Sequence, residues 1–412
     1  MSELSYLEKL LDGVEVEWLS LGELGDFIRG NGLQKKDFVE SGFPAIHYGQ
    51  IYTRYGLSAD KTFTYVLPEL ANKLRKAQKN DLLLATTSEN DEDVVKPLAW
   101  LGDNVAISGD MMLFRHEQNV KYLAYFFQSE IFQTQKMKYI TGAKVRRVSS
   151  GDLSKIKIPI PSSNNPEKSL TIQSEIVRIL DKFTALTAEL TAELTAELTM
   201  RKNQYNYYRD QLLCFDEAEV EWKTLADVAI LRRGRVMSKG YLEQNAGDYP
   251  VYSSQTARNG MIGSIDTYDF DGEFISWTTD GANAGTVFYR TGKFSITNVC
   301  GLIKIHENYP ISYKYLYYWL SIEAQKHVYS GMGNPKLMSH QVEKITVPIP
   351  FPASPEKSML EQQRIVGILD KLEAITFSLT EGLPREIELR QKQYEYYRDL
   401  LFSFPRPETA SN

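Results

Sequence analysis

The sequence lacks the signatures of most enzyme classes. Its five histidines and two cysteines form no His-Glu-x-x-His pattern and no paired Cys-x-x-Cys pattern. It has no GxxxxGK[ST] phosphate-binding loop. It also has no Pro-Pro dipeptide, which excludes the [Asp/Asn]-Pro-Pro-[Tyr/Phe] site of amino-methyltransferases. We therefore predict no catalytic residue, no metal ligand and no cofactor for this chain.

Long apolar runs are also missing. No stretch approaches 18 consecutive apolar residues, and the first residues form no positively charged, apolar leader. The two cysteines, Cys214 and Cys300, are interpreted as buried thiols. We expect a cytoplasmic globular protein of two or three domains, because the chain has 412 residues, of which 42% are hydrophobic and 24% charged.

The net charge of −6 argues only weakly against nucleic-acid binding, because binding follows local patches. Acidic residues are frequent in the stretches predicted below to be long helices. Basic residues cluster elsewhere, at Lys35-Lys36, Lys144–Arg147 and Arg232–Arg235. The charge pattern thus leaves DNA binding open.

One long stretch of the chain is repeated. Residues 166–213 return at 355–401 with a constant offset of 189, so that Pro166 matches Pro355 and Asp181 matches Asp370. The shared frames are PEKS…IV.ILDK and Q.YYRD.L. An internal repeat of this length indicates a duplicated architecture.

Both copies have apolar residues at helical spacing and predict long helices that pair as an antiparallel coiled coil. The alternative is two unrelated surface helices, which the shared register disfavours. The expected seam residues are Ile172, Ile176, Ile179, Phe183, Leu186, Leu190, Leu194, Leu198, Tyr205, Tyr208 and Leu212, and Ile365, Ile368, Leu372, Ile375, Leu379, Leu383, Ile387, Tyr394, Tyr397 and Leu401. The first copy contains the tetrapeptide Thr-Ala-Glu-Leu three times at 187–198, and the second contains Pro384, where we expect a kink.

The segments that precede the two helices share a faint skeleton. Val16-Glu17-Trp18 returns as Val220-Glu221-Trp222 at an offset of 204, which makes the two segments differ by 15 residues (204 − 189). The segment Asp81–Thr87 resembles Glu273–Thr279, and similar short apolar runs read as strands, followed by helices near 121–132 and 313–325. The predicted fold class is mixed α+β, with two similar α/β domains separated by two long helices. The predicted boundaries are 1–161, 162–215, 216–350 and 351–412.

The loops after the predicted strands carry side chains of the kind that contact phosphates and base edges. For any single residue, a solvated surface side chain is the simpler interpretation. The Gly-rich stretch 281–285 is more simply a turn than a phosphate cradle. The candidate DNA-binding residues are Arg29, Asn31, Lys35, Lys36, His47, Tyr48, Gln50, Arg54, Lys144, Arg146 and Arg147 in the first domain, and Arg232, Arg233, Arg235, Ser253, Gln255, Thr278, Thr279, Asn283, Asn334 and Lys336 in the second.

Taken together, the repeated frames, the divergent domains between them and the Thr-Ala-Glu-Leu copies resemble the specificity subunit of a type I restriction-modification system, of the type IC branch. The resemblance covers the whole chain. It implies a non-catalytic subunit that binds a bipartite, asymmetric site on double-stranded DNA, one half-site per domain, with the helices acting as a spacer. It also implies two methyltransferase subunits that use S-adenosylmethionine, and restriction subunits that use ATP with Mg²⁺.

One alternative from another class is a coiled-coil scaffold whose end domains bind proteins and which has no role on DNA. Salt-dependent binding to duplex DNA distinguishes the two, because phosphate neutralisation releases counterions. A fused methyltransferase is excluded by length and by the missing motifs.

Overall fold

The computed structural model describes residues 10, 11, 13–216, 220–307, 309–331 and 333–404, with the backbone alone at 377–381. The chain divides into two compact units. The first contains residues 1–195 and 384–412, and the second contains residues 196–383. Each of the two long helices, α8 (Pro166–Leu212) and α13 (Pro355–Leu401), therefore contributes one half to each unit.

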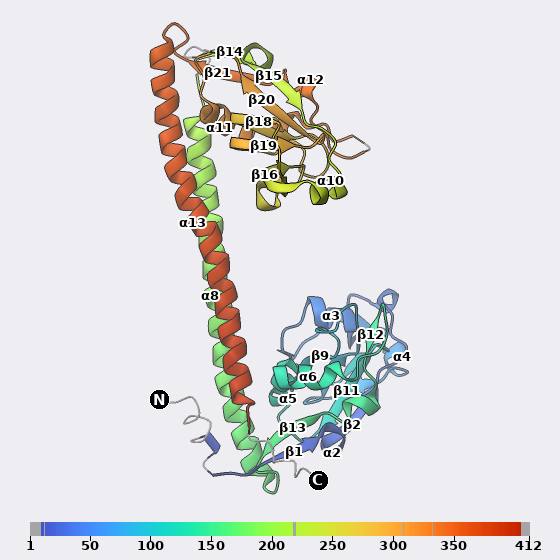
Figure 1. The fold of residues 1–412 in the computed structure, drawn as a ribbon. Helices are drawn as coiled ribbons and strands as arrows, with labels where there is room; N and C mark the ends of the chain where they lie inside the picture. Colours follow the sequence, from blue (N-terminus) through green and yellow to red (C-terminus); the bar gives the residue numbers. More distant parts are fainter. Residues whose placement is uncertain (1–9, 12, 217–219, 308, 332, 405–412) are drawn as a thin grey trace. The chain divides into compact units, whose positions relative to one another are not determined.

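The first unit holds an α/β domain with two main sheets, ordered β2-β11-β7-β9-β4 and β5-β3-β10-β6 (Figure 1). Its helix α5 is almost entirely buried, because Val120 and residues 122–127 all face apolar neighbours. The elements are β1 (Val16–Ser20), α2 (Leu21–Leu24), β2 (Gly25–Arg29), η1 (Lys35–Asp37), β3 (Phe43–Ile46), α3 (Tyr48–Thr53), β4 (Ser58–Ala59), β5 (Thr64–Val66), α4 (Pro68–Ala71), β6 (Lys76–Ala77), β7 (Leu82–Ala85), β8 (Thr87–Ser88), β9 (Lys96–Trp100), β10 (Val105–Ile107), β11 (Met111–His116), α5 (Val120–Gln128), α6 (Glu130–Met137), β12 (Arg146–Arg147), α7 (Ser150–Leu153) and β13 (Lys157–Pro161).

The second unit holds an α/β domain with one six-stranded sheet, ordered β15-β20-β18-β19-β16-β17. Helix α11 covers this sheet and begins at an N-cap, Ser312, whose hydroxyl accepts from the Tyr315 amide. The elements are β14 (Val220–Thr224), α9 (Leu225–Val228), β15 (Ala229–Arg233), α10 (Lys239–Gln244), β16 (Ala246–Tyr252), η2 (Ala257–Gly260), β17 (Met261–Ile265), β18 (Phe270–Thr278), β19 (Val287–Ile296), β20 (Cys300–Ile305), α11 (Tyr313–Glu323), η3 (Ala324–His327), α12 (Ser339–Val342) and β21 (Thr346–Pro350).

The two domains have one topology, as the fold-class prediction states. Strand β2 pairs with β11 as β15 pairs with β20, and β3 pairs in parallel with β10 as β16 pairs with β19. Most of the difference in length lies between Ile46 and Ala85 in the first domain (85 − 46 = 39) and between Tyr252 and Thr278 in the second (278 − 252 = 26). The first domain spends these residues on β4, β5, α4 and β6.

The predicted match of Asp81–Thr87 with Glu273–Thr279 is wrong by one residue. Ala85 pairs with Met111 as Thr278 pairs with Cys300, so Thr86 corresponds to Thr279 and not to Thr278. The backbone amides of Thr86 and Thr279 accordingly donate to Asp110 and Val299, which are equivalent residues. A shift of one residue moves every side chain of a strand to the opposite face.

The repeated helix frames attach each domain to its own helix. In the first unit, Asp181 on α8 accepts hydrogen bonds from Lys121 Nζ at 2.5 Å and from Tyr125 Oη at 2.8 Å. In the second unit, Asp370 on α13 accepts from Lys314 Nζ at 2.6 Å and from Tyr318 Oη at 2.7 Å. The frames thus repeat because the same docking contacts are made twice.

The end of the other helix completes each unit. In the first, Phe402 after α13 packs against Tyr122 and Phe126, with ring centroids 5.2 and 5.7 Å away. In the second, Phe215 after α8 packs against Tyr315. Because the start of one helix and the end of the other meet in each unit, the helices pair antiparallel there, as predicted.

Several seam predictions are wrong. Leu186, Tyr208 and Ile375 are exposed by 52%, 45% and 59%, whereas Leu180 and Leu369, which were not predicted, are buried. Where apolar residues follow one another at steps of four, the seam departs from a strict heptad. Residues predicted from the heptad spacing then lie outside the seam. The side chain of Leu379 lies outside the described residues.

Helix α13 continues through Pro384, so no break occurs there, and the kink stays a prediction. Within the described part of the chain, no helix is both long enough and apolar enough to span a lipid bilayer.

Candidate nucleic-acid interface

A tight turn precedes the strands β11 and β20, and one arginine holds it in each domain. Arg29 donates from Nε to the carbonyl of Gly109 at 3.0 Å. Arg233 donates from Nη2 to the carbonyl of Asn298 at 2.7 Å. The two arginines are equivalent, because β2 and β15 have the same pairing register. Sequence reasoning selected both arginines but did not relate them.

Glycines allow the backbone to approach these turns closely. A Cβ on Gly30 would lie 2.1 Å from the carbonyl oxygen of Ser108. A Cβ on the equivalent Gly234 would lie 2.2 Å from that of Ile296. No side chain fits at either distance, so only glycine keeps the arginine next to its turn.

In the second domain, predicted residues from separate loops converge on this turn. Ser253 Oγ lies 2.9 Å from Thr297 Oγ1, and Asn283 Nδ2 donates to the carbonyl of Ser254 at 3.4 Å. Arg235 forms a bridge to Thr297 through the backbone. These side chains come from four segments, so the fold builds a single polar surface from them.

The first domain holds its equivalent residues differently. His47 is buried, accepts at Nδ1 from the Gly49 amide and caps α3, and burial lowers the pKa of its imidazole. Gln50 accepts from the His47 amide at 2.9 Å. Asn31 accepts from the Arg75 amide and donates to the Lys73 carbonyl. These three side chains build the loops and have little freedom to contact a ligand.

A second basic site lies at β12, beside an acidic loop. Arg147 is exposed, whereas Arg146 Nε lies 2.9 Å from Asp91 Oδ1 in an ion pair whose geometry makes no hydrogen bond. The acidic loop is fixed by Lys136, a buried residue that donates from Nζ to the carbonyls of Glu92 and Val94. Burial lowers the pKa of the Lys136 ammonium to about 8.

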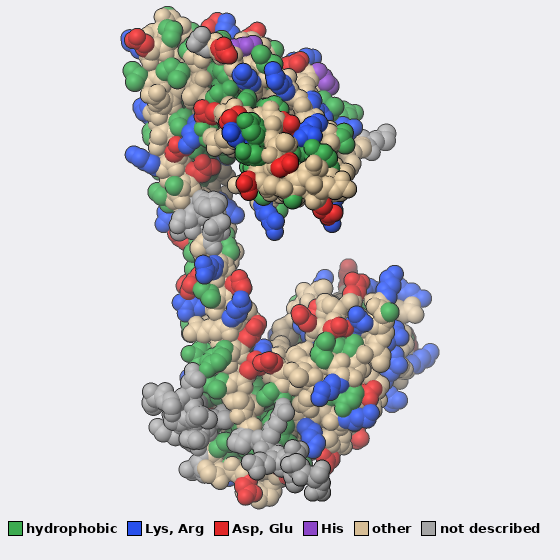
Figure 2. All heavy atoms as spheres, in the orientation of Figure 1, with side chains coloured by type: hydrophobic (Ala, Val, Ile, Leu, Met, Phe, Trp, Pro, Cys, Tyr) green, Lys and Arg blue, Asp and Glu red, His purple; other side chains and the backbone are tan. Residues whose placement is uncertain are grey.

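Sequence reasoning missed Lys136, because a buried lysine in an amphipathic helix looks like a solvated one. Figure 2 draws Lys and Arg side chains gathered on the edge of the first domain that carries α4 and β12.

The predicted residues divide by exposure. The exposed ones are Arg29, Asn31, Lys35, Lys36, Arg54, Lys144, Arg147, Arg232, Arg233, Arg235, Asn334 and Lys336, and the half-buried ones are Tyr48, Gln50, Arg146, Ser253, Gln255 and Asn283. His47, Thr278 and Thr279 are buried, and the hydroxyls of the two threonines donate to Asn283 and Asp280 within the protein. We therefore remove these three residues from the proposed contact surface.

Arg235 and Lys336 are exposed but already have partners. Arg235 Nε donates to Asp269 at 3.0 Å, and Lys336 Nζ lies 4.0 Å from Asp280.

Among the residues that the structure describes, no group of three or more His, Cys, Asp or Glu side chains could hold a metal ion.

The helices expose apolar side chains at repeated positions. In the first unit these are Leu186, Leu389 and Tyr396, and in the second they are Ile375, Met200 and Tyr207. Each residue of the first set matches one of the second at an offset of 189, and all six are between 49% and 61% exposed. Each unit thus has the same apolar surface, which we call the helix stripe.

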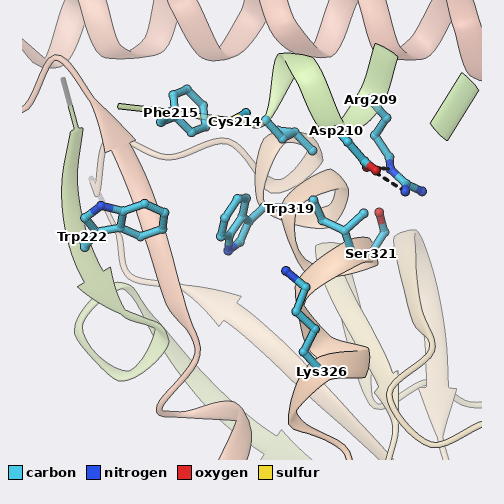
Figure 3. A pocket seen from close by; sticks show the side chains of 10 residues that line it. Arg209, Asp210, Cys214, Phe215, Trp222, Trp319, Ser321 and Lys326 are labelled. Atoms are coloured by element: carbon cyan, nitrogen blue, oxygen red, sulfur yellow. Dashed lines mark hydrogen bonds and ion pairs between the residues drawn. The ribbon is translucent and has the colours of Figure 1, made fainter. Parts of the chain in front are cut away.

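A groove of about 640 Å³, lined by both apolar and charged side chains, lies at the end of α8 in the second unit (Figure 3). Trp222 and Trp319 line it, with ring centroids 5.6 Å apart, together with the exposed Cys214. Trp222 is 39% exposed, whereas the equivalent Trp18 of the first unit is 9% exposed. The groove lies at the helix end of the second unit and does not include the turn that Arg233 holds.

The shared fold and the two turns held by Arg29 and Arg233 define a protein with two related domains of different surface chemistry. Comparison with known proteins gives the family. The type I restriction modification DNA specificity domain matches residues 13–200 and 217–389. The chain belongs to this family, and it is a DNA-recognition subunit and not the enzyme of its system.

Two relatives come from Escherichia coli. The chain is 40% identical to the type I restriction enzyme EcoR124I/EcoR124II specificity subunit over 436 residues, with 100% of both chains covered. It is 34% identical to the EcoprrI specificity subunit, with 92% of this chain and 93% of the relative covered.

Solved structures share the fold. A chain from a study of complex assembly and conformational transition of the type I R-M system aligns with a TM-score of 0.68 at 15% identity, covering 94% of this chain and 97% of that one. The HsdS subunit from Thermoanaerobacter tengcongensis aligns with a TM-score of 0.54 at 13% identity, covering 94% and 96%.

Proposed function

We propose that each domain reads one half of a bipartite, asymmetric site on double-stranded DNA. The observation that carries this proposal is the pair of equivalent turns held by Arg29 and Arg233. The scaffold is the same in both domains, but Gly109 and Asp110 stand in one turn where Asn298 and Val299 stand in the other. Equal positions with different side chains suit two half-sites of different sequence.

The exposed arginines around these turns and at the second basic site on β12 would contact phosphates and so set the register of the protein on the duplex. We expect Arg147→Ala to weaken binding equally on all sequences and to lower the slope of log K against log salt by about one unit. Lys336→Ala is expected to have a smaller effect, since Asp280 already lies 4.0 Å from its ammonium.

Fluorescence anisotropy with duplexes at several salt concentrations measures this slope. The matched control is Lys182→Ala, an exposed cation on α8 that belongs to neither turn. A slope equal to that of the unmodified chain for Arg147→Ala argues against a phosphate contact. Binding without any salt dependence favours the protein scaffold over the DNA reader.

We further propose that the helix stripes bind two methyltransferase subunits, one on each unit. Exposed apolar side chains at matching positions mark an interface, and their duplication fits two copies of one partner. Those subunits would supply S-adenosylmethionine chemistry, and restriction subunits would supply ATP and Mg²⁺. We also place the complex in the cytoplasm, assign it to the type IC branch and keep the domain boundaries predicted from the sequence.

Native mass spectrometry of the co-expressed complex tests the partner proposal. Leu186→Lys with Leu389→Lys alters only the first unit and is expected to reduce two bound partners to one. Ala188→Lys, at an exposed position two residues along α8 and on another face, serves as the control. Two partners retained by the double variant would contradict the assignment.

A further inference from the structure

One arginine lies in the interior of the second domain. Arg290 on β19 is 5% exposed, and its Nε donates to Ser276 Oγ at 3.0 Å. Its guanidinium lies between two rings, 3.6 Å from the centroid of Tyr252 and 4.4 Å from that of Phe288. Burial lowers its pKa to about 10. No carboxylate of the described residues forms an ion pair with it, and burial of a charge without such a partner is unfavourable.

The first domain has a tryptophan at this position. The backbone amide of Trp100 donates to the carbonyl of Asp81. Arg290 pairs with Phe274 at the equivalent place in the second domain. Trp100 belongs to the same buried apolar cluster as Ile46, and Ile46 is equivalent to Tyr252, on which Arg290 stacks. This fold therefore accepts an apolar side chain here, so that core packing alone does not explain Arg290.

A strained loop lies directly next to the guanidinium. The loop 253–260 is closed by a hydrogen bond from the Ser253 amide to the Gly260 carbonyl at 2.8 Å. Arg258, Asn259 and Gly260 have φ angles of 51°, 52° and 83°. Glycine adopts such an angle freely, but Arg258 and Asn259 do not, and two successive non-glycine residues in the left-handed region are costly and persist only where the surroundings hold them.

Gly260 is the point of closest approach between the loop and the arginine. A Cβ placed on it would lie 3.2 Å from Arg290 Nη2, 3.1 Å from the Gln255 carbonyl oxygen and 3.2 Å from the Ser253 carbonyl oxygen. The guanidinium thus lies against a loop that also carries Ser253, Gln255 and the exposed Arg258.

We propose that Arg290 is a positioning residue: it holds the loop 253–260 in its left-handed conformation and thereby determines which bases the second domain accepts. This inference rests on the proposed function, since it requires that the loop contacts DNA. The guanidinium, itself fixed by stacking and by its bond to Ser276, supports the loop through its close approach at Gly260, while side chains of the loop contact the bases. A tryptophan at this position would fill the interior but lacks the guanidinium that approaches Gly260; the single N–H of Trp100 donates to the Asp103 carbonyl in the first domain.

Arg290→Trp tests the proposal, because it installs the residue that the first domain uses. The full-length chain in its assembled complex selects sequences from a random duplex pool, and thermal melting reports the fold. We expect the melting temperature to stay near that of the unmodified chain. Discrimination in the second half-site should fall about tenfold, the loss of one base contact, while the first half-site is unchanged.

Gly260→Ala gives an independent measurement that leaves the Arg290 side chain itself unmutated. It forces a Cβ against the guanidinium at a position with positive φ, so we expect the same loss in the second half-site. In the Arg290→Trp background the same change should add little, because the two changes disrupt one contact. A second half-site that is unchanged by Gly260→Ala overturns the proposal even if Arg290→Trp fails to fold.

Gln255→Ala with Arg258→Ala separates this inference from the proposed function. These changes remove side chains of the loop and leave Arg290 in place. If they leave both half-sites unaltered, the loop does not contact DNA and the proposed function of this surface fails. If they alter the second half-site and neither Arg290→Trp nor Gly260→Ala does, only the role of Arg290 is refuted.

Discussion

Removing one copy of the repeated tetrapeptide is expected to shorten the unread spacer of the DNA site by one base pair. The deletion of Thr191–Leu194 lies within α8, a continuous helix of 47 residues. Leu190 and Leu194 are half-buried, as is Leu198. After the deletion Leu198 follows Leu190 at the same spacing of four, so the leucines of the seam stay in register.

The size of the change follows from helix geometry. Four residues contribute about 6 Å of rise and rotate the rest of the helix by about 40°. One base pair of B-DNA contributes about 3.4 Å and about 35°. The rotations agree closely, and the excess rise has to be absorbed by tilt or by bending of the DNA. The local hydrogen bond also survives, because Thr195 Oγ1, which now donates to the Thr191 carbonyl at 2.7 Å, meets the carbonyl of Thr187 instead.

Methylation mapping of cells that carry the complete system reads both half-sites and the spacer in one experiment. The account predicts two unchanged half-sites and a spacer shorter by one base pair. A deletion of three residues rotates the seam residues that follow it by about 60° in the opposite sense and should impair assembly. Replacing Thr191–Leu194 by Lys-Ala-Gln-Leu keeps the length and serves as the control. An unaltered spacer after the four-residue deletion would refute the reasoning and leave the repeats as a linker of good helix formers.

Two further predictions concern stability. Asp370→Asn removes the carboxylate that accepts from Lys314 and Tyr318, and calorimetry should show the second unit destabilised by about 2 kcal/mol, with Asp181→Asn acting equally on the first; no change in either would contradict the docking role of the repeated frames. Burial lowers the pKa of His116 to about 4 from 6.5, so the unfolded chain binds the proton first and stability should fall, by up to about 3 kcal/mol, as the pH falls from 6.5 to 4. His116→Gln should remove that part of the pH dependence, and an identical pH profile would show that His116 does not carry it.

The duplicated architecture could be predicted from sequence because it depends on repeated residues. The frames around Asp181 and Asp370 repeat, since each makes the same contacts to a lysine and a tyrosine. The seam could be predicted only in part. Leu186 and Ile375 follow the heptad but are exposed; in both helices the predicted apolar residues continue from there at steps of four, which displaces the seam from a strict heptad.

The candidate surface was harder to predict, because surface and interior residues are of the same types. Thr278 and Thr279 looked like base readers, but the strand that carries them is buried on both faces. Arg290 was not among the predicted residues, because no pattern in the sequence distinguishes a stacked, buried arginine from an exposed one. Such assignments depend on the register between strands, which a shift of one residue reverses.

Exchange of one domain tests the central claim most directly. The chain with residues 16–160 replaced by the equivalent segment of a relative is expressed with its partner subunits, and the methylated sequences are mapped. The account predicts a new first half-site, an unchanged second half-site and an unchanged spacer. A change in both half-sites would contradict the claim that each domain reads its own half of the DNA.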